Sequence, residues 1–467
     1  MEYSMVIDGR SVTTGQWDDV INPAKGEPFA QCPRGTQANV EEAVQAAARA
    51  FKTWKTDEAV RRKALNDCAA AIQGRVQDIA AVLSQEQGKP VTAAMAEIFG
   101  ASMWFSYYAS LPIEAETLQD DGEKTIKVVR KPLGVVAAIT PWNFPVILLA
   151  WKLAPAWLAG NTVVAKPSPY TPLTSLMVAD ILKSIVPPGV LNVLSGGNEL
   201  GATLAQHPLV RKISFTGSVA TGKKIMGYAV EDLKRVTLEL GGNDPAIVLD
   251  DVDPQAVAER LFWSAFQNSG QVCTAVKRLY LHEKVYDPIV KGLTELAKNT
   301  KVGPGTDPDT KLGPINNKMQ LDRVMGLVED AKKGGAKIEA GGVRLEGSGY
   351  FYPPTIVTNV GPGVRLVDEE QFGMALPVMK YSNVDDAIAQ ANATHYGLGG
   401  SVWTSNVERG TALAQELESG TAWVNHHMDI TPYAPFGGAK WSGIGYENGR
   451  WGYEAFTELQ VVNTKKG

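Results

Sequence analysis

The chain has 467 residues, of which 44% are hydrophobic and 20% charged, and its formal net charge is -5. This length allows two or three domains with a substantial core. The slightly negative charge, with no basic block, argues against nucleic acid or an anionic membrane as a partner.

The sequence shows no clear secretory signal, membrane span or disulfide pattern. The first ten residues contain acids and lack an apolar run, and no apolar stretch is long enough to cross a bilayer. The three cysteines, Cys32, Cys68 and Cys273, are far apart, which fits neither a disulfide framework nor a metal-ligand motif. We therefore expect a cytoplasmic protein without a metal site.

Helical periodicity dominates the first 110 residues. Asn39 is predicted to cap a helix, with Glu42 three residues later, and apolar residues then recur at helical spacing as far as Trp54. A second helical region is expected over residues 56–87. A third should run from Val91 into the aromatic stretch at 104–108, whose rings we assign to the core.

From residue 134 the pattern changes to short apolar runs separated by helices, which indicates a parallel sheet covered on both faces. The runs are 134–140, 162–166, 191–195, 211–215 and 236–240. A second α/β series extends from about Pro245 to Thr421. Residues 118–131 and 456–462 fall outside this scheme and are expected to be edge strands that pair between subunits.

Three segments carry residues suited to chemistry. Cys273 follows a glycine-containing polar stretch, and Glu239 stands before two glycines. A thiol can attack a carbonyl, and a carboxylate can activate the water that later removes the adduct. Asn143 supplies an amide donor between aromatic residues and prolines. A lone cysteine is more often a small buried apolar residue, so this constellation becomes informative only as a set.

Two further segments have a chemistry that favours phosphate or sugar ligands. Residues 215–222 form a strand end with a glycine turn ahead of a helix, where free N–H groups and the helix dipole attract phosphate. The segment lacks the G-x-G-x-x-G pattern, so an ordinary turn is the alternative. Lys166 ends an apolar strand, where a charged side chain is either solvated or holds a ligand.

In chain order, the TPWNFP, LELGG and GQVC segments resemble the signatures of the aldehyde dehydrogenase superfamily. Further matches spread over nearly the whole chain and lie at 166–168, 215–218, 369–373 and 435–438. The resemblance implies an α/β fold with a Rossmann-like cofactor domain, an α/β catalytic domain and a small β oligomerisation element. Their expected boundaries are 1–113 with 134–241, 242–441, and 114–133 with 450–467, in a homodimer or homotetramer.

The resemblance also implies a mechanism. Cys273 would attack the aldehyde, and Asn143 with the Cys273 N–H would stabilise the oxyanion. Glu239 would activate water to hydrolyse the thioester. Its presence favours the hydrolytic reaction over the alternative, transfer of the acyl group to coenzyme A. Lys152 and Glu447 match positions that support water activation or relay protons, although a surface ion pair is an alternative for both.

Cofactor contacts follow from the same resemblance. Lys166 and Ser168 would bind the adenosine ribose, Glu370 the nicotinamide ribose, and Trp142 would line the cofactor cleft. The other expected contacts are Thr140, Gly217, Ser218, Gly241 and Phe372. Pro169 stands where NAD-preferring relatives often carry an acidic residue, so we expect NAD as the usual cofactor and NADP as an accepted one.

The matching substrate-tunnel positions are almost wholly apolar: Phe144, Leu148, Trp151, Val272, Thr274, Ile430 and Phe436. They include no arginine to bind a carboxylate, so an uncharged aromatic or medium aliphatic aldehyde is predicted over the alternative, a semialdehyde.

Several residues near the expected site have two alternative roles or depart from the family pattern. His426, His427 and Tyr433 would stand at the tunnel mouth or be solvated loop residues. Asn243, Met374 and Lys277 depart from the family pattern. Met374 is expected to alter the loop that carries Glu370 and with it the mobility of the nicotinamide, whereas the sequence assigns no role to Asn243 or Lys277.

Overall fold

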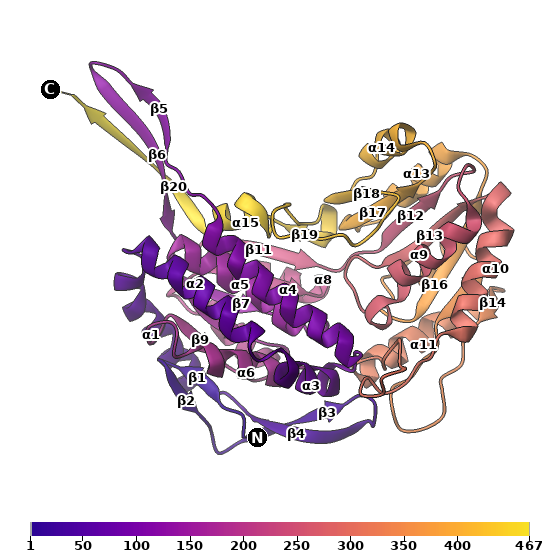
Figure 1. Cartoon of the computed structure of the whole chain (residues 1–467), viewed down its shortest axis with the longest axis horizontal. Coiled ribbons are helices and arrows are strands. Elements are labelled where there is room, and N and C mark those ends of the chain that lie inside the picture. Colours follow the sequence, from indigo (N-terminus) through magenta and orange to yellow (C-terminus); the bar gives the residue numbers. More distant parts are fainter. Residues whose placement is uncertain (1, 467) are drawn as a thin grey trace.

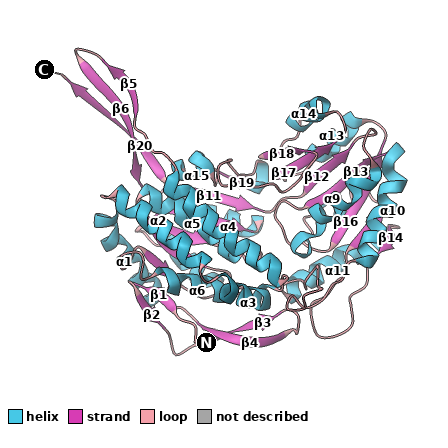
Figure 2. Cartoon of the chain, viewed as in Figure 1, coloured by secondary structure: helices cyan, strands magenta, loops and turns pink. Residues whose placement is uncertain are grey.

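The computed structural model describes residues 2–466, and its strands form two large sheets with a separate three-stranded arm (Figure 1). Helices surround both sheets, which gives two α/β lobes (Figure 2). The predicted α/β class with parallel strands is confirmed. Within residues 2–466, no helix is both long and apolar enough to cross a membrane.

The first sheet has eight strands in the order β19-β11-β10-β7-β8-β9-β1-β2. Its parallel centre runs from β9 to β11, while β1 and β19 pair antiparallel with their neighbours. The strands are β1 (Met5–Ile7), β2 (Arg10–Val12), β7 (Val135–Ile139), β8 (Thr162–Lys166), β9 (Leu191–Val193), β10 (Val210–Gly217), β11 (Arg235–Leu240) and β19 (Gly443–Ile444).

Eight helices belong to this lobe, and their apolar faces join its sheet in one core. They are α1 (Gln37–Trp54), α2 (Glu58–Gln73), α3 (Val76–Gln87), α4 (Val91–Ser110), α5 (Pro145–Ala159), α6 (Leu173–Leu182), α7 (Asn198–Gln206) and α8 (Val219–Val230). Helix α5 is buried along almost its whole length, packed between the sheet and α4. Its N-terminus directly follows the TPWNFP segment, which fixes the position of that segment against the core.

The second sheet has seven strands in the order β14-β15-β16-β13-β12-β17-β18, with only β14 antiparallel. The strands are β12 (Asp244–Val248), β13 (Val276–His282), β14 (Lys337–Ala340), β15 (Thr355–Thr358), β16 (Ala375–Tyr381), β17 (Gly399–Trp403) and β18 (Thr421–Val424). The helices of this lobe are α9 (Pro254–Phe266), α10 (Glu283–Asn299), α11 (Lys318–Lys333), α12 (Arg365–Asp368), α13 (Val384–Asn392) and α14 (Val407–Gln415).

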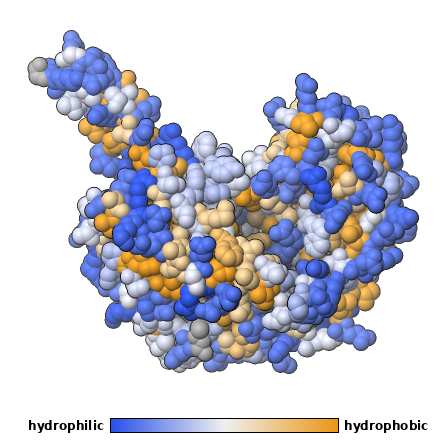
Figure 3. Space-filling model, in the orientation of Figure 1, coloured by the Kyte–Doolittle hydropathy of each residue, from blue (hydrophilic) through white to orange (hydrophobic). Residues whose placement is uncertain are grey.

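The arm consists of β5 (Glu116–Asp120), β6 (Lys124–Pro132) and β20 (Thr457–Lys465), with β6 in the middle. It projects from the first lobe, and Figure 3 shows a notch between it and the lobe that carries α13 and α14. The remaining elements are the hairpin β3 (Trp17–Asn22) and β4 (Glu27–Pro33), the short helices η1 (Gln267–Gly270) and η2 (Lys440–Ser442), and α15 (Gly449–Glu454).

The predicted cap of the first helix was wrong. The cap of α1 is Thr36, whose backbone is extended and whose hydroxyl accepts the N–H of Asn39; the Asn39 side chain completes the capping box. The helical region predicted over 56–87 consists of two helices, because α2 ends at Gln73, with Gly74 as its cap, and α3 begins at Val76. The strands β1 to β4 were not predicted.

Candidate active site

Cys273 lies in the loop between α9 and β13, and an unusual backbone shapes that loop. Asn268, Ser269 and Gly270 all adopt left-handed conformations, with φ of 52°, 60° and 71°. Such a run is costly unless its surroundings hold it in place. The Ser269 hydroxyl donates to the carbonyl of Gly313 at 2.8 Å, and a Cβ at residue 270 would overlap the main chain of Gly373. The loop is thus pinned immediately ahead of the thiol.

Asn143 is held from both sides. Its Nδ2 donates to the Gln271 carbonyl at 3.0 Å, and its own carbonyl accepts from Lys89 Nζ at 2.9 Å and Asn268 Nδ2 at 3.2 Å. Because an amide nitrogen carries two N–H groups, one remains for another acceptor. The structure therefore brings Asn143 and the Cys273 loop together.

The ion pair behind Asn143 was not predicted from the sequence. Lys89 and Glu97 are buried, with Nζ and Oε2 2.5 Å apart. The other Glu97 oxygen accepts the N–H of Val146 at 2.9 Å, at the first turn of α5. This pair ties α4 to the loop that carries Asn143. A sequence signal existed, since Glu97 has helical spacing from the apolar residues Ala94 and Ala101 and so belongs to a buried face.

Glu239 is in β11, the neighbour of β10, and is buried. Neither of its carboxylate oxygens has a hydrogen-bond partner among the described residues. Burial and the negative charge of Glu447 raise its pKa to about 8, although the Lys152 ammonium and the proximity of the Cys273 thiol oppose the shift. Burial and the Glu239 charge also raise the pKa of the Cys273 thiol well above its usual value, against the effect of Lys277. Glu239 and Cys273 therefore share one enclosed region.

Lys152 and Glu447 form a buried ion pair, with Nζ and Oε1 2.6 Å apart and side chains only 0% and 2% exposed. The Lys152 ammonium also donates to the hydroxyls of Ser214 and Thr216. The alternative of a surface ion pair is wrong, since both side chains are buried.

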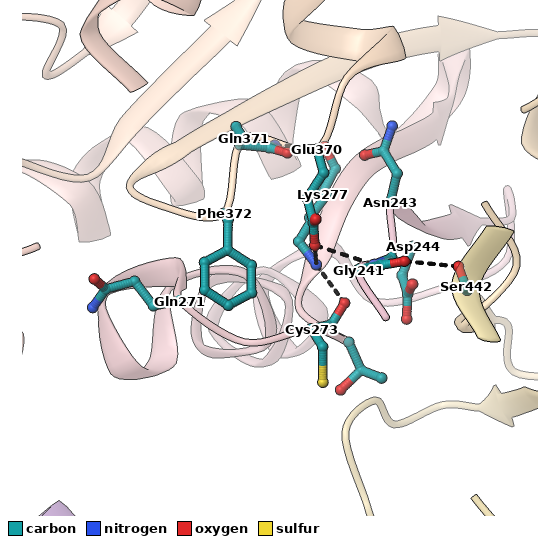
Figure 4. Close-up of polar contacts among 12 residues, drawn as sticks. Gly241, Asn243, Asp244, Gln271, Cys273, Lys277, Glu370, Gln371, Phe372 and Ser442 are labelled. Atoms are coloured by element: carbon teal, nitrogen blue, oxygen red, sulfur yellow. Dashed lines mark hydrogen bonds and ion pairs between the residues drawn. The ribbon is translucent and has the colours of Figure 1, made fainter. Parts of the chain in front are cut away.

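Glu370 comes before β16, where its Oε1 accepts the N–H of Gly242 at 3.1 Å and lies 3.3 Å from Lys277 Nζ (Figure 4). A Cβ on Gly241 would overlap this carboxylate, so only glycine allows the close approach. Phe372 follows with a positive φ, and its ring stands edge-to-face with Trp142, centroids 5.3 Å apart. These residues form one wall of the site.

Lys166 is buried at the end of β8, where its Nζ donates to the carbonyls of Pro167 and Gly196. Burial lowers its pKa to about 8. The alternative of a solvated lysine is therefore wrong. Ser168 is also buried, whereas Pro169 is exposed and borders a cleft of 940 Å³ that extends to Gly197. None of Cys273, Glu239 and Asn143 lines that cleft.

The turn after β10 presents Gly217 and Ser218 at the N-terminus of α8, where Ser218 caps the helix by accepting the N–H of Thr221. Thr140 lies beyond the end of the neighbouring β7, and its buried Oγ1 has no hydrogen-bond partner among the described residues. A helix N-terminus favours phosphate, and an unpartnered hydroxyl favours a polar ligand. These residues fit a dinucleotide.

The predicted tunnel residues lie around the same region. Leu148, Trp151 and Phe436 are in the core cluster of the first lobe, against which Phe144, Ile430 and Cys273 pack. The Trp151 and Phe436 rings are edge-to-face, with centroids 5.6 Å apart. Val272 and Thr274, on either side of the thiol, are buried.

The histidines at the expected tunnel mouth behave differently. His426 and Tyr433 are exposed, as expected of loop residues. For His427 that expectation was wrong, because its Nε2 is 2.7 Å from the Thr274 carbonyl oxygen and its Nδ1 is 2.8 Å from the Ser401 hydroxyl. Burial lowers its pKa to about 3, so the ring is neutral and supports the thiol loop. Across residues 2–466, no group of three or more histidine, cysteine or acidic residues has the arrangement of a metal site.

Comparison with known proteins agrees with this geometry. The model of the aldehyde dehydrogenase family matches residues 12–462. Retinaldehyde dehydrogenase 3 of Rattus norvegicus is 40% identical over 468 residues, covering 98% of this chain and 91% of that protein. A chloroplastic aminoaldehyde dehydrogenase of Arabidopsis thaliana is 39% identical over 462 residues, covering 95% and 92%.

Solved structures give the same result. The NAD⁺ complex of an aldehyde dehydrogenase from Bacillus cereus has a TM-score of 0.97 to this chain at 35% identity, covering 100% of this chain and 97% of the other. The match extends across both lobes and the arm. This chain therefore belongs to the aldehyde dehydrogenase family and is an NAD(P)-dependent oxidoreductase that acts on aldehydes.

Proposed function

We propose that this protein oxidises an uncharged aromatic or medium aliphatic aldehyde to its carboxylic acid, through a covalent adduct on Cys273. The observation that carries the proposal is Glu239, a buried carboxylate without a hydrogen-bond partner beside a thiol whose pKa it raises. A base that has no structural partner is available to a water molecule.

The first step is attack of the Cys273 thiolate on the aldehyde carbon, which moves the carbonyl electrons onto oxygen. The oxyanion would accept hydrogen bonds from the Cys273 N–H and from the remaining N–H of the Asn143 amide. Loss of one such donor costs about 3–4 kcal/mol of barrier. Lys89 and Glu97 support this step by holding the Asn143 loop.

When bound, the nicotinamide cofactor accepts the hydride that turns the thiohemiacetal into a thioester. Glu239 then takes a proton from water, the water oxygen forms a bond to the acyl carbon, and the Cys273 thiolate leaves. The buried Lys152–Glu447 pair lies close enough to influence the pKa of Glu239, so it would receive or supply protons during this step.

The residues that would hold the cofactor are those whose geometry fits a dinucleotide. Gly217 and Ser218 would receive the pyrophosphate at the α8 N-terminus, while Lys166 and Ser168 would contact the adenosine ribose. Thr140, Trp142, Gly241 and Phe372 would surround the nicotinamide side together with Glu370. NAD would be the usual cofactor. NADP would also be accepted, because Pro169 carries no charge to repel its 2′-phosphate.

The substrate class rests on the apolar surroundings of the thiol. Burying apolar substrate surface contributes about 25 cal/mol per Å². No arginine occupies the tunnel positions, so the carboxylate of a semialdehyde would be desolvated without a partner. The semialdehyde alternative is thereby disfavoured. Transfer to coenzyme A remains the alternative reaction, and Glu239 argues against it because water is then not the acceptor.

The domain assignment is also part of the proposal. Residues 1–113 with 134–241 would bind the dinucleotide, 242–441 would carry the thiol, and 114–133 with 450–467 would join subunits in a homodimer or homotetramer. Support comes from the separate sheet of each part and from the projecting arm.

The test is a panel of aromatic and aliphatic aldehydes and semialdehydes with NAD or NADP, in which the absorbance of the reduced cofactor is followed. We expect turnover of the uncharged aldehydes, a free acid as product without coenzyme A, and no turnover by Cys273→Ala. Cofactor binding by Cys273→Ala would show that this variant is folded. Full activity of that variant would contradict the mechanism, and preferred turnover of a semialdehyde would contradict the substrate class.

A further inference from the structure

Lys277 is placed by an irregularity in the second sheet. In the pairing of β12 with β13, Asp244 faces Val276 and Pro245 faces Arg278, so Lys277 is an extra residue between two registers. Bulges of this kind redirect a side chain and are frequent beside active sites. The Lys277 carbonyl accepts from Gln371 Nε2 at 3.0 Å, which anchors the bulge to the segment that carries Glu370.

The redirected side chain is buried, with only 2% of its surface exposed. Its ammonium group donates to the Cys273 carbonyl, lies 3.3 Å from Glu370 Oε1, and stands 5.7 Å from the centroid of the Phe372 ring. Figure 4 shows it between the Glu370 carboxylate and the main chain of Cys273, with the sulfur directed away. A buried ammonium without partners would be costly, so these contacts determine its position.

The surroundings of Lys277 are otherwise acidic. The carboxylates that face the thiol region are Glu239 from β11, Asp244 from β12, Glu370 from the segment before β16, and the more distant Glu447. The neighbouring Arg278 is turned away toward main-chain carbonyls of α13, and His427 is neutral. Asn243 adds no charge, since its amide donates to the Val367 carbonyl. Lys277 therefore places a positive charge directly against the nucleophile's main chain.

We propose that Lys277 is a positioning residue that links the main chain of Cys273 to the carboxylate of Glu370 and supplies the positive charge that favours the thiolate. This inference rests on the proposed function, in which Cys273 is the nucleophile and Glu370 contacts the cofactor. It assigns a role to a residue that departs from the family pattern.

Two consequences follow for the thiol and for Glu370. Burial raises the pKa values of Cys273, Asp244 and Glu370, and Lys277 acts against the shift at each of them. Removing its charge would make the thiolate rarer at neutral pH. It would also leave the Glu370 carboxylate with the Gly242 N–H as its remaining close donor, so the hold on the cofactor would change with it.

The experiment measures alkylation of Cys273 by iodoacetamide against pH, without cofactor or aldehyde, in the wild type, Lys277→Met and Lys277→Arg. Met keeps the length of the side chain and removes the charge, while Arg keeps the charge. We expect alkylation about tenfold slower at neutral pH in Lys277→Met, equivalent to about one pKa unit, and near-normal alkylation in Lys277→Arg. Cys273→Ala shows which part of the signal belongs to this thiol.

Two controls separate charge from packing. Lys284→Met removes an exposed lysine that is paired with Asp250 and should leave the profile unchanged. Lys277→Gln retains a hydrogen-bond donor without charge, so it should resemble Lys277→Met. An unchanged alkylation profile in both neutral variants would overturn the proposal, as would an equal loss in Lys277→Arg.

The link to Glu370 needs a second readout, the NAD dissociation constant from protein fluorescence in Lys277→Met, Glu370→Gln and the double variant. If the two side chains act as a pair, their effects are not additive. If the effects of the two substitutions on the NAD dissociation constant are additive, Lys277 and Glu370 do not act as a pair, and that part of the proposal is wrong. Alkylation requires no turnover. Failure of the aldehyde panel alone would therefore count against the proposed function, whereas the role of Lys277 is decided by the alkylation and NAD-binding measurements.

Discussion

Glu239 shows at the scale of one residue how burial creates a catalytic property. The side chain is buried and neither carboxylate oxygen has a hydrogen-bond partner among residues 2–466, so its neutral form is favoured and its pKa rises to about 8. Lys152 limits the rise, because its ammonium stabilises the ionised form. A carboxylate in this state can accept a proton from water near neutral pH, whereas an exposed glutamate is a much weaker base.

This property predicts a pH dependence. Because only ionised Glu239 acts as a base, thioester hydrolysis should speed up as pH rises through about 8 and fall about tenfold per unit well below it. Glu239→Gln should remove this dependence. It should still allow one rapid round of cofactor reduction, after which the thioester accumulates because it is not hydrolysed. Stopped-flow absorbance would measure both phases. Steady turnover of Glu239→Gln at the wild-type rate would rule out this role for Glu239.

At the scale of elements, helix ends and strand irregularities place the side chains. The α8 N-terminus presents Gly217 and Ser218, and the bulge in β13 directs Lys277 inward. Helix α1 packs against one face of the first sheet, where it contacts β7, β8 and β9. Its capping box satisfies backbone N–H groups that otherwise have no partner in the first turn.

Thr36→Ala should therefore destabilise the protein by about 1 kcal/mol, since it removes the side-chain acceptor for the Asn39 N–H. The midpoint of chemical denaturation would measure the loss. Thr53→Ala, at the other end of the same helix, is the matched control and should stay within about 0.5 kcal/mol of wild type. Equal effects of the two substitutions would show that the cap contributes nothing specific.

At the scale of the whole molecule, the arm is the feature that a single chain does not explain. Nearly all of β20 is exposed, including Leu459, Val461 and Val462, and Leu118 on β5 is exposed as well. Exposed strand edges with apolar side chains favour pairing with another chain. This pattern supports the proposed homodimer or homotetramer.

Val461→Lys combined with Leu459→Lys should then shift the protein toward monomers in sedimentation velocity, because two charges would be buried in the subunit contact. Val407→Lys is a suitable control, since Val407 is 61% exposed on α14 and Val461 is 60% exposed on the arm. An unchanged sedimentation coefficient in the arm variant would mean that subunits, if they associate, use another surface.

Much of the fold was predictable because it depends on local patterns. Apolar runs such as 162–166 and 236–240 lie within or close to the observed strands β8 and β11, and the helical spacing from Val91 onward matches α4. An error occurred where local signals compete, since Thr36 and Asn39 both suit a helix start. The break at Gly74, which divides the predicted helical region into α2 and α3, was not predicted. Strands β1 and β2 have only three residues each, and β3 and β4 mix exposed and buried positions, so none of them forms a clear apolar run.

For the site, the sequence by itself determined the chemical groups, since Cys273, Glu239 and Asn143 stand in recognisable segments, and with them the family. Only the tertiary structure decided the environment of those groups. It buried Lys152 with Glu447, tied Lys89 to the Asn143 carbonyl, and brought Lys277 to Glu370 across 93 positions of sequence. The physical reason is that burial and charge interactions depend on distance in space, and residues so far apart in the chain acquire that distance only when both lobes are folded.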